Sequence, residues 1–207
     1  MTLVENRIYL ASRSPRRQEL LKQIGVDFMV LPLREALARI PDVDETPLPQ
    51  ELPPEYVERI ARVKAETGRK RMSERGWADF PVLGADTAVV SNGRIFGKPE
   101  NPLHAKQMLQ ALSGQLHQVL TAVAVAAGNE TRVCLSRSSV RFRNLGEQEI
   151  GHYLACGEAY DKAGAYAIQG RAAVFISKIS GSYSGVVGLP LFETAQLLEE
   201  SGIRIFQ

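Results

Sequence analysis

An acidic residue stands inside one of the most apolar segments of the chain. The segment is PVLGADTAVV, residues 81–90, and Asp86 is its only charged residue. A carboxylate in a buried strand must be paired with a cation, bound to a metal or used in catalysis, because burying an isolated charge is costly. The alternative is a structural aspartate that accepts hydrogen bonds from nearby N–H groups.

Two lysines could supply cations for such a site. Lys64 continues the apolar stripe of a predicted helix at helical spacing, so it lies on the core side of that helix. It either extends toward water or reaches a buried anion, and taken alone the first is favoured. Lys98 stands in GKPEN, just after a predicted hairpin, where an exposed turn lysine is the ordinary interpretation.

The segment LASRSPRRQELL, residues 10–21, combines hydroxyls and arginines at a predicted strand-to-helix turn. Ser14 suits the N-cap and Pro15 suits the first helical position. Backbone N–H groups at a helix start attract anions, and Ser12 and Arg16 add donors that suit a phosphate. A capped surface helix with solvated arginines explains the segment equally well.

Residues 34–54 are rich in proline and are predicted to form a long loop, with one helical turn near residues 35–39. Loops of this length in a compact domain are usually functional or disordered. Asp42, Asp44 and Glu45 stand in this loop. These acids either are solvated or lend a carboxylate to a hard divalent cation.

Composition narrows the classes of function. The chain has 207 residues, of which 44% are hydrophobic and 23% charged, with a formal net charge of +2. This balance excludes a disordered protein and, without a basic run, argues against nucleic-acid binding. Two cysteines and three scattered histidines give no zinc spacing. The sequence has no apolar run long enough for a bilayer and does not begin like a signal peptide, so a cytoplasmic location is expected.

The elements that must position these residues alternate between strands and helices. Strands are predicted at residues 7–11, 28–33, 81–90, 94–96, 116–127, 131–143 and 172–180. Helices are predicted at residues 15–24, 54–75, 102–113, 147–155 and 191–201. The glycine-rich segments 157–171 and 180–190 are predicted to be loops. This mixture without a repeat predicts an α/β fold with a mixed sheet, in a single domain of residues 1–207.

Together these residues predict a site for a polyphosphate and a divalent metal. The set comprises one buried acid, one or two loop acids, two lysines and an arginine at a helix start. Neither a GxxxxGKS loop nor a GxGxxG fingerprint occurs in the sequence. P-loop and dinucleotide-binding chemistry are therefore excluded.

Several sequence segments resemble the Maf family, the septum-formation-inhibitor-like nucleoside triphosphate pyrophosphatases. The segments that carry the resemblance are, in order, LASRSPRRQELLKQIG, YVERIARVKA, VLGADTAVV, GKPENPLHAKQML, LSGQLHQVLTAVAV, DKAGAYAIQG and GSYSGVVGLPL. The resemblance implies an elongated α/β fold with two lobes around a central cleft, similar to the inosine triphosphate pyrophosphatases. It also implies hydrolysis of a nucleoside triphosphate to the monophosphate and pyrophosphate with Mg²⁺ or Mn²⁺, as a house-cleaning activity.

The resemblance further implies roles for individual residues. Asp86 matches the catalytic acid, and it shares the metal with Glu45, for which Asp44 is the fallback. The phosphate-binding positions are Ser12, Arg16, Arg17, Lys64 and Lys98. The positions that set substrate preference are Arg16, Thr87 and Gln169. The stretch DKAGAYAIQG resembles the subgroup that acts on dTTP and UTP, and the amide of Gln169 can donate to and accept from a pyrimidine ring.

The expected partner is a nucleoside triphosphate, with no stable nucleic acid and no membrane, and the family suggests a homodimer. One alternative is a nucleotide- or RNA-binding regulator of cell division without turnover. Another is a phosphatase that releases orthophosphate. Release of pyrophosphate by the purified protein separates these hypotheses.

Overall fold

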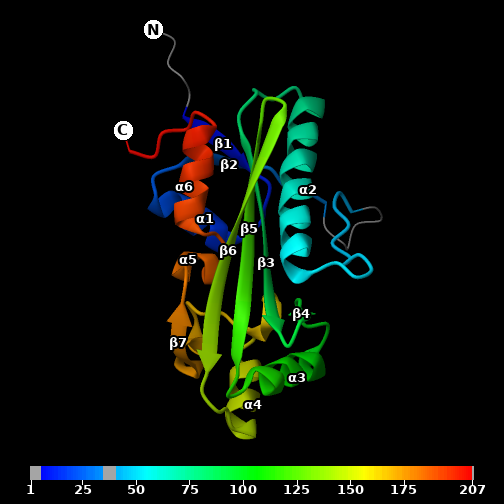
Figure 1. The fold of residues 1–207 in the computed structure, drawn as a ribbon, viewed down its shortest axis with the longest axis vertical. Helices are drawn as coiled ribbons and strands as arrows, with labels where there is room; N and C mark the ends of the chain where they lie inside the picture. Colours follow the sequence, from blue (N-terminus) through cyan, green and yellow to red (C-terminus); the bar gives the residue numbers. More distant parts are fainter. Residues whose placement is uncertain (1–5, 35–40, 207) are drawn as a thin grey trace. The chain divides into compact units, whose positions relative to one another are not determined.

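The computed structural model describes residues 6–34 and 41–206, so the helical turn predicted near residues 35–39 lies outside the described residues. Figure 1 shows the elements along the chain. In chain order they are β1 (Arg7–Leu10), α1 (Pro15–Gln23), β2 (Asp27–Val30), α2 (Pro53–Glu74), β3 (Val82–Ser91), β4 (Arg94–Phe96), α3 (Pro102–Leu112), β5 (Leu116–Ala127), β6 (Glu130–Phe142), α4 (Glu147–Ala155), two 3₁₀ helices (Ala163–Ala165 and Arg171–Phe175), β7 (Ile176–Ser180), α5 (Tyr183–Val187) and α6 (Leu191–Glu200).

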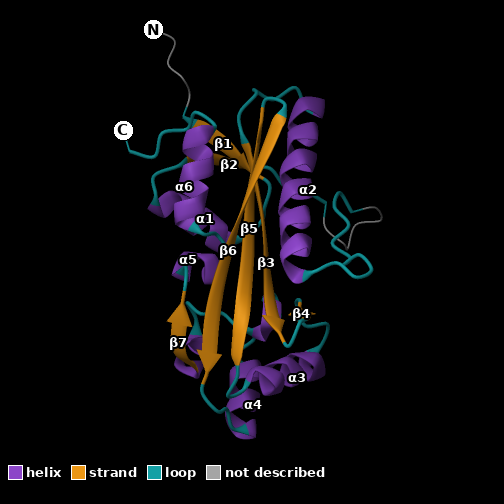
Figure 2. Ribbon diagram, in the orientation of Figure 1, coloured by secondary structure: helices purple, strands orange, loops and turns teal. Residues whose placement is uncertain are grey.

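The strands join in one mixed sheet with the order β2-β1-β3-β5-β6-β7, and β4 pairs with β3. β1 runs parallel to both β2 and β3, whereas the β3–β4 and β6–β7 pairs are antiparallel. Helices are interspersed with the strands along the chain and lie beside the sheet, as Figure 2 shows. The α/β class predicted from the sequence is therefore confirmed. Among the described residues, no helix combines the length and the apolar character needed to cross a membrane.

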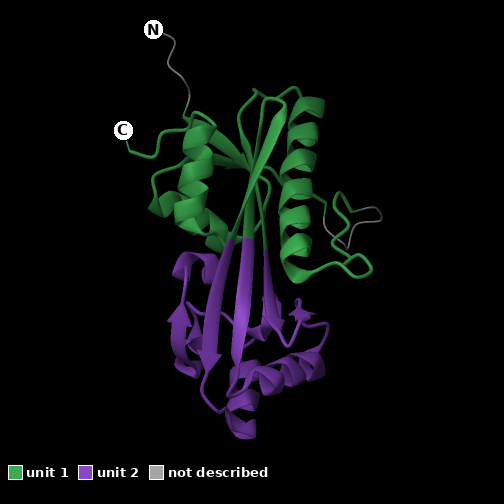
Figure 3. Ribbon diagram, viewed as in Figure 1, with its two compact units in different colours: residues 1–86, 122–135, 188–207 green, residues 87–121, 136–187 purple. Residues whose placement is uncertain are grey.

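The chain divides into two compact units, which are coloured separately in Figure 3. Unit 1 consists of residues 1–86, 122–135 and 188–207, and unit 2 of residues 87–121 and 136–187. The chain passes from unit 1 to unit 2 inside β3, between Asp86 and Thr87. The single domain, the elongated form and the central cleft expected from the sequence stay predictions.

In unit 1, the long helix α2 packs closely against β3. Two prolines begin the helix, and the side chain of Glu55 accepts a hydrogen bond from the backbone N–H of Leu52 at 3.2 Å. A Cβ atom added at Gly84 would lie 2.6 Å from the carbonyl oxygen of Ala61 and 2.6 Å from the backbone nitrogen of Ala65. Glycine at this position therefore lets α2 approach the strand, which brings Lys64 beside β3.

The core of unit 1 next to this contact is apolar and partly aromatic. Tyr9 of β1 stacks on Trp77 with ring centroids 5.4 Å apart. The buried members of the cluster are Tyr9, Ala11, Leu31, Leu33, Val43, Met72 and Val82. Because Val43 belongs to this cluster, the loop before α2 is anchored to the core between Asp42 and Asp44.

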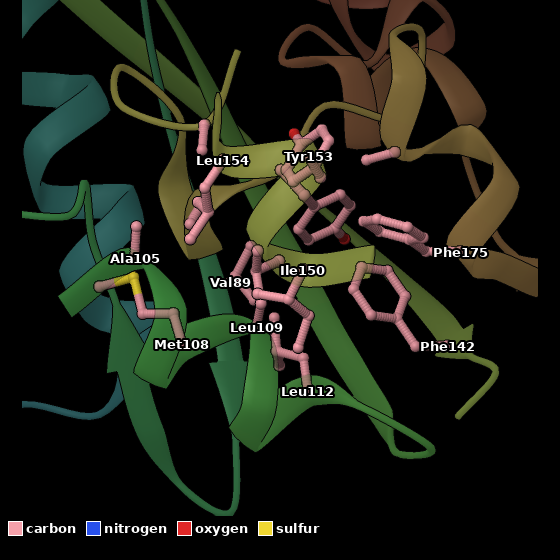
Figure 4. Close-up of a cluster of buried hydrophobic side chains, with 14 of the residues drawn as sticks. Val89, Ala105, Met108, Leu109, Leu112, Phe142, Ile150, Tyr153, Leu154 and Phe175 are labelled. Carbon is pink, nitrogen blue, oxygen red and sulfur yellow. The ribbon is translucent and has the colours of Figure 1, made fainter. Parts of the chain in front are cut away.

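Unit 2 has its own hydrophobic core, part of which is drawn in Figure 4. Its aromatic rings meet edge to face, with Phe142 and Phe175 at 6.0 Å and Tyr153 and Phe175 at 5.1 Å. The buried members are Val89, Ala105, Met108, Leu109, Leu112, Val119, Val140, Phe142, Ile150, Tyr153, Leu154, Ala159, Ala165, Tyr166, Ala172 and Phe175. His117 also lies here, 2% exposed, and its Nε2 is 2.9 Å from the hydroxyl of Tyr166.

The strand predicted over residues 172–180 is wrong in its first half. Residues Arg171–Phe175 form a 3₁₀ helix, and only Ile176–Ser180 pair as β7. The carboxylate of Glu158 accepts hydrogen bonds from the backbone N–H groups of Arg171 (2.9 Å) and Ala172 (3.4 Å). A negative charge at a helix start stabilises the helix, and here it comes from a residue outside the segment.

The loop predicted over residues 180–190 is also partly wrong, because it contains the short helix α5. The hydroxyl of Ser182 accepts a hydrogen bond from the backbone N–H of Gly185 at 3.0 Å, as an N-cap does. Thr121 of β5 donates its hydroxyl proton to the carbonyl oxygen of Gly185 at 2.7 Å. Capping and this buried contact therefore stabilise a helix whose composition alone favours a loop.

Candidate active site

The turn between β1 and α1 brings a hydroxyl and an arginine together. Ser14 occupies the N-cap as predicted, but its side chain makes no capping hydrogen bond to any described residue. Instead, its backbone N–H donates to Oγ of Ser12 at 3.2 Å. The guanidinium of Arg17 donates to the same oxygen at 3.2 Å and, through Nε, to the carbonyl oxygen of Gly188 at 2.8 Å.

These contacts hold Arg17 as part of the framework of unit 1. Burial lowers the pKa of its guanidinium, the charges of Asp86 and Glu45 raise it, and the charge of Arg16 lowers it. All three charged groups therefore lie within electrostatic reach of Arg17. The predicted phosphate-binding residues Ser12, Arg16 and Arg17 share one neighbourhood with the predicted catalytic acid.

Lys64 joins the two predicted metal ligands. Its ammonium lies 2.8 Å from Oδ1 of Asp86 and 2.9 Å from Oε1 of Glu45. The side chains of Lys64 and Asp86 are only 14% and 10% exposed, whereas that of Glu45 is 53% exposed. Lys64 thus reaches a buried anion, and the extension toward water that its position alone favoured is wrong.

The structure also separates the three acids of the long loop. Asp42 accepts hydrogen bonds from Arg71 at 2.5 Å and from Arg34 at 2.8 Å. Burial opposes its ionisation, but these bonds outweigh burial and hold its pKa far below the usual range. Asp44 is exposed and accepts the backbone N–H of Thr46 at 2.9 Å. Only Glu45 pairs with Lys64 among these three, which favours it over Asp44 as the loop carboxylate of the site.

Tyr56 and Arg59 attach the loop to α2, and neither was among the predicted site residues. The hydroxyl of Tyr56 donates to the carbonyl oxygen of Glu45 at 3.1 Å, and Arg59 donates to that of Thr46 at 3.1 Å. Burial raises the pKa of Tyr56, and the charges of Asp86 and Glu45 raise it further, so its hydroxyl stays a donor. A tyrosine and an arginine on a helix near its start give no sequence signal of such a contact.

The carboxylates of Asp86 and Glu45 fit a divalent cation of the magnesium type. They converge on one cation, the ammonium of Lys64, so their oxygens point into a common region. Within residues 6–34 and 41–206, no three His, Cys, Asp or Glu side chains gather as a metal cluster. Mg²⁺ commonly takes one or two carboxylates and completes its shell with water and substrate phosphates. Two carboxylates therefore suffice when a triphosphate supplies further oxygens.

The remaining predicted residues belong to unit 2. Thr87 follows Asp86 along β3, and its hydroxyl oxygen lies 3.1 Å from that of the buried Thr121. Lys98 is exposed, next to Gly97, whose carbonyl oxygen accepts the backbone N–H of Gly164 at 3.0 Å. Gln169 is exposed between the two 3₁₀ helices. The structure thus gathers the unit 1 residues, and the roles of Thr87, Lys98 and Gln169 stay predictions.

Comparison with known proteins supports one family throughout. The family described as Maf-like protein matches residues 7–201. The chain is 94% identical to a dTTP/UTP pyrophosphatase of Nitrosospira multiformis over 207 residues, 100% of both chains. It is 60% identical to a dTTP/UTP pyrophosphatase of Nitrosomonas europaea over 206 residues, again 100% of both chains.

A solved structure, that of the Staphylococcus aureus Ham1 protein, is 20% identical and covers 66% of this chain and 71% of that chain with a TM-score of 0.45. The family suggested by the ordered motifs is confirmed by the match over residues 7–201. The chain belongs to the Maf-like protein family.

Proposed function

We propose that this protein is a nucleoside triphosphate pyrophosphatase that hydrolyses dTTP and UTP to the monophosphate and pyrophosphate. Its relatives at 94% and 60% identity carry the name dTTP/UTP pyrophosphatase. The observation that carries the proposal is the ammonium of Lys64, held at 2.8 Å and 2.9 Å between two carboxylates. Two carboxylates and an ammonium so close together support a site that combines a general base, a cation and oxygen ligands for a metal.

The phosphate chain is bound by the cationic part of the site. Arg16, Arg17 and Lys64 provide positive charge, and Ser12 provides a hydroxyl at the start of α1. Lys98 adds a further cation, as the family suggests. Fixed cations stabilise the charge that develops on the phosphoryl oxygens and on the departing pyrophosphate, and this effect supplies most of the catalysis in phosphoryl transfer.

Asp86 is the general base. Its Oδ1 is engaged by Lys64, so we assign the proton transfer to Oδ2. A water molecule gives its proton to this oxygen and forms a bond to the α-phosphorus, while the bond from that phosphorus to the bridging oxygen breaks and pyrophosphate leaves. A positioned base contributes about 10²- to 10⁴-fold to the rate.

A divalent metal, Mg²⁺ or Mn²⁺, would be held by Asp86 and Glu45. When bound, it neutralises phosphate charge and polarises the phosphoryl group under attack. The Glu45 side chain is 53% exposed, so it is accessible to a metal–nucleotide complex from solvent. The role of Lys64 is to keep the two carboxylates together before the ligand arrives.

Substrate preference is assigned to Arg16, Thr87 and Gln169. The Gln169 amide can donate to a carbonyl oxygen and accept from the N3–H of uracil or thymine, and modified pyrimidines that keep this edge are further candidate substrates. The nucleotide pools for this reaction are in the cytoplasm, which we therefore propose as its location. A homodimer and the lack of a stable nucleic-acid partner stay predictions from the family and from composition.

The test is a panel of canonical and modified nucleotides incubated with Mg²⁺ and purified protein, with products identified by ³¹P nuclear magnetic resonance. We expect UTP or dTTP to give UMP or dTMP together with pyrophosphate. CTP and the purine nucleotides should react more slowly. Orthophosphate as the first product would indicate a phosphatase. Nucleotide binding without any product would indicate a sensor and overturn the proposed hydrolysis.

A further inference from the structure

The loop that carries Glu45 is fastened to α2 at two consecutive carbonyl oxygens. Tyr56 donates its hydroxyl proton to the carbonyl of Glu45, and Arg59 donates from Nη2 to the carbonyl of Thr46, both at 3.1 Å. These two helix residues are three positions apart, so they lie on neighbouring parts of one helix face. The helix therefore holds the backbone of the loop where the Glu45 side chain departs from it.

Glu51 fixes the position of the Arg59 side chain. Its carboxylate binds Arg59 in a two-point arrangement, with Oε1 at 2.5 Å from Nε and Oε2 at 2.7 Å from Nη2. The Glu51 side chain is 7% exposed and that of Arg59 is 26% exposed. Glu51 also accepts the backbone N–H of Leu48 at 3.0 Å, so one carboxylate fixes both the arginine and the turn before α2.

The same helix face continues to the site itself. Tyr56, Ile60 and Lys64 follow one another at four-residue spacing, which places them along one side of α2. Tyr56 holds the backbone of Glu45, and Lys64 holds its carboxylate at 2.9 Å. The guanidinium of Arg59 also lies over the Tyr56 ring, 5.6 Å from its centroid. Backbone and side chain of Glu45 are thus both attached to α2.

We propose that Tyr56 and Arg59, with Arg59 locked by Glu51, are positioning residues that place the Glu45 carboxylate beside Asp86 for the divalent metal. The inference rests on the proposed function, because it assigns the metal to these two carboxylates. The hydrogen bonds of Tyr56 and Arg59 go to backbone carbonyl oxygens of the loop, so these residues position Glu45 through the loop backbone.

The physical reason is preorganisation. A carboxylate on an unfastened loop must be ordered when the metal arrives, whereas a fastened one is ordered during folding. Removing groups that orient a metal ligand typically weakens metal affinity by about 10- to 100-fold. For loss of the single Tyr56 hydroxyl we expect about a tenfold rise in the dissociation constant of the metal, at the lower end of that range.

The deciding variant is Tyr56→Phe, which keeps the ring and removes only the donor. Arg59→Gln tests the second attachment. The matched control is Arg69→Gln, because Arg69 also stands on α2 and also contacts a carboxylate at two points, that of Asp79, at 2.8 Å and 3.2 Å. Each variant is titrated with Mn²⁺ in the presence of α,β-methylene-UTP, and bound Mn²⁺ is measured by electron paramagnetic resonance.

A second measurement needs no ligand. The backbone amides of Thr46 and Leu48 are hydrogen-bonded inside the loop, to Asp44 and Glu51 respectively. Their hydrogen exchange should become faster in Tyr56→Phe and in Arg59→Gln but not in the Arg69→Gln control. In a Glu45→Gln background, Tyr56→Phe should cause no further loss of Mn²⁺ affinity, because it acts only through Glu45.

Tyr56→Phe with the Mn²⁺ affinity and amide exchange of the control would overturn the inference. So would an equal loss of affinity in the presence and absence of Glu45, which would show that Tyr56 acts elsewhere. Failure of the proposed function gives a different result: the wild-type protein releases no pyrophosphate, while Tyr56→Phe still accelerates exchange at Thr46 and Leu48 because the attachment itself is real.

Discussion

Replacing Lys64 by methionine removes the cation that Asp86 and Glu45 share and keeps most of the side-chain volume. At 2.8 Å, the attraction between Lys64 and Asp86 amounts to about 6 kcal/mol at an effective dielectric constant of about 20. Desolvation offsets part of this attraction, and removing one partner of a buried pair typically destabilises by about 3–5 kcal/mol.

The structure narrows this range for Lys64→Met. The Asp86 side chain is 10% exposed, so its charge stays largely buried after the loss of Lys64. Glu45 is 53% exposed and screened by water, so its share is at most about 1 kcal/mol. We therefore expect the free energy of unfolding at neutral pH to fall by about 3 kcal/mol, mostly through Asp86.

The assay is urea denaturation followed by circular dichroism, together with pyrophosphate release from UTP. Lys70→Met is the matched control, because Lys70 is an exposed lysine on the same helix. Turnover of Lys64→Met should fall by about 10²- to 10³-fold, the usual effect of removing one group that stabilises transition-state charge. Adding Asp86→Asn should recover much of the lost stability. Equal stability of the two lysine variants, within about 0.5 kcal/mol, would refute the reasoning.

Gly84→Ala should lower stability by about 1–3 kcal/mol and reduce turnover, because its Cβ would push α2 away from β3; denaturation and kinetics check this. Burial lowers the pKa of His117 to about 4, so the folded protein holds this imidazole neutral while the unfolded chain protonates it near pH 6.5. The free energy of unfolding should therefore fall by up to about 3 kcal/mol as the pH decreases from about 6.5 to 4. Denaturation at a series of pH values checks this, and His117→Gln should remove the dependence. Asn101→Ala removes the cap of α3 and should lower the melting temperature, at a cost of about 1 kcal/mol, with turnover unchanged.

The central part of the site could be predicted from the sequence because its residues break local patterns. Asp86 interrupts an apolar strand, and Lys64 falls on the core side of an amphipathic helix. Each residue has an alternative explanation when it is considered alone. A partner of opposite charge, however, makes the burial of both charged side chains favourable. The structure supplies that partner for each of them, at 2.8 Å.

Other parts depend on contacts between residues far apart in the chain. Composition could not distinguish Glu45 from Asp42 and Asp44, because the difference lies in the partner of each acid. These partners are the ammonium of Lys64, the guanidinium of Arg71 and the backbone N–H of Thr46, respectively. Arg17 fits a phosphate ligand by its place at a helix start, yet its Nε binds the carbonyl of Gly188, 171 positions away. No periodicity carries that information.

Two of the errors in the predicted secondary structure have the same origin. The strand was predicted from residue 172 because Val174 and Phe175 favour strands, but Arg171–Phe175 form a 3₁₀ helix whose first N–H groups are bound by Glu158. The segment around α5 has loop composition but becomes helical because Ser182 caps it and Thr121 binds its carbonyl. In both places, a specific hydrogen bond outweighs a weak local preference. Secondary-structure propensities are weak in general, and tertiary contacts often override them.

The most direct test of the catalytic centre is single-turnover hydrolysis of UTP by Asp86→Asn, with folding checked by circular dichroism. We expect a folded protein that binds the nucleotide and releases pyrophosphate at least about 10²-fold more slowly than the wild type. A folded Asp86→Asn variant with wild-type turnover would show that this carboxylate neither takes the proton nor holds the metal, and would contradict the account.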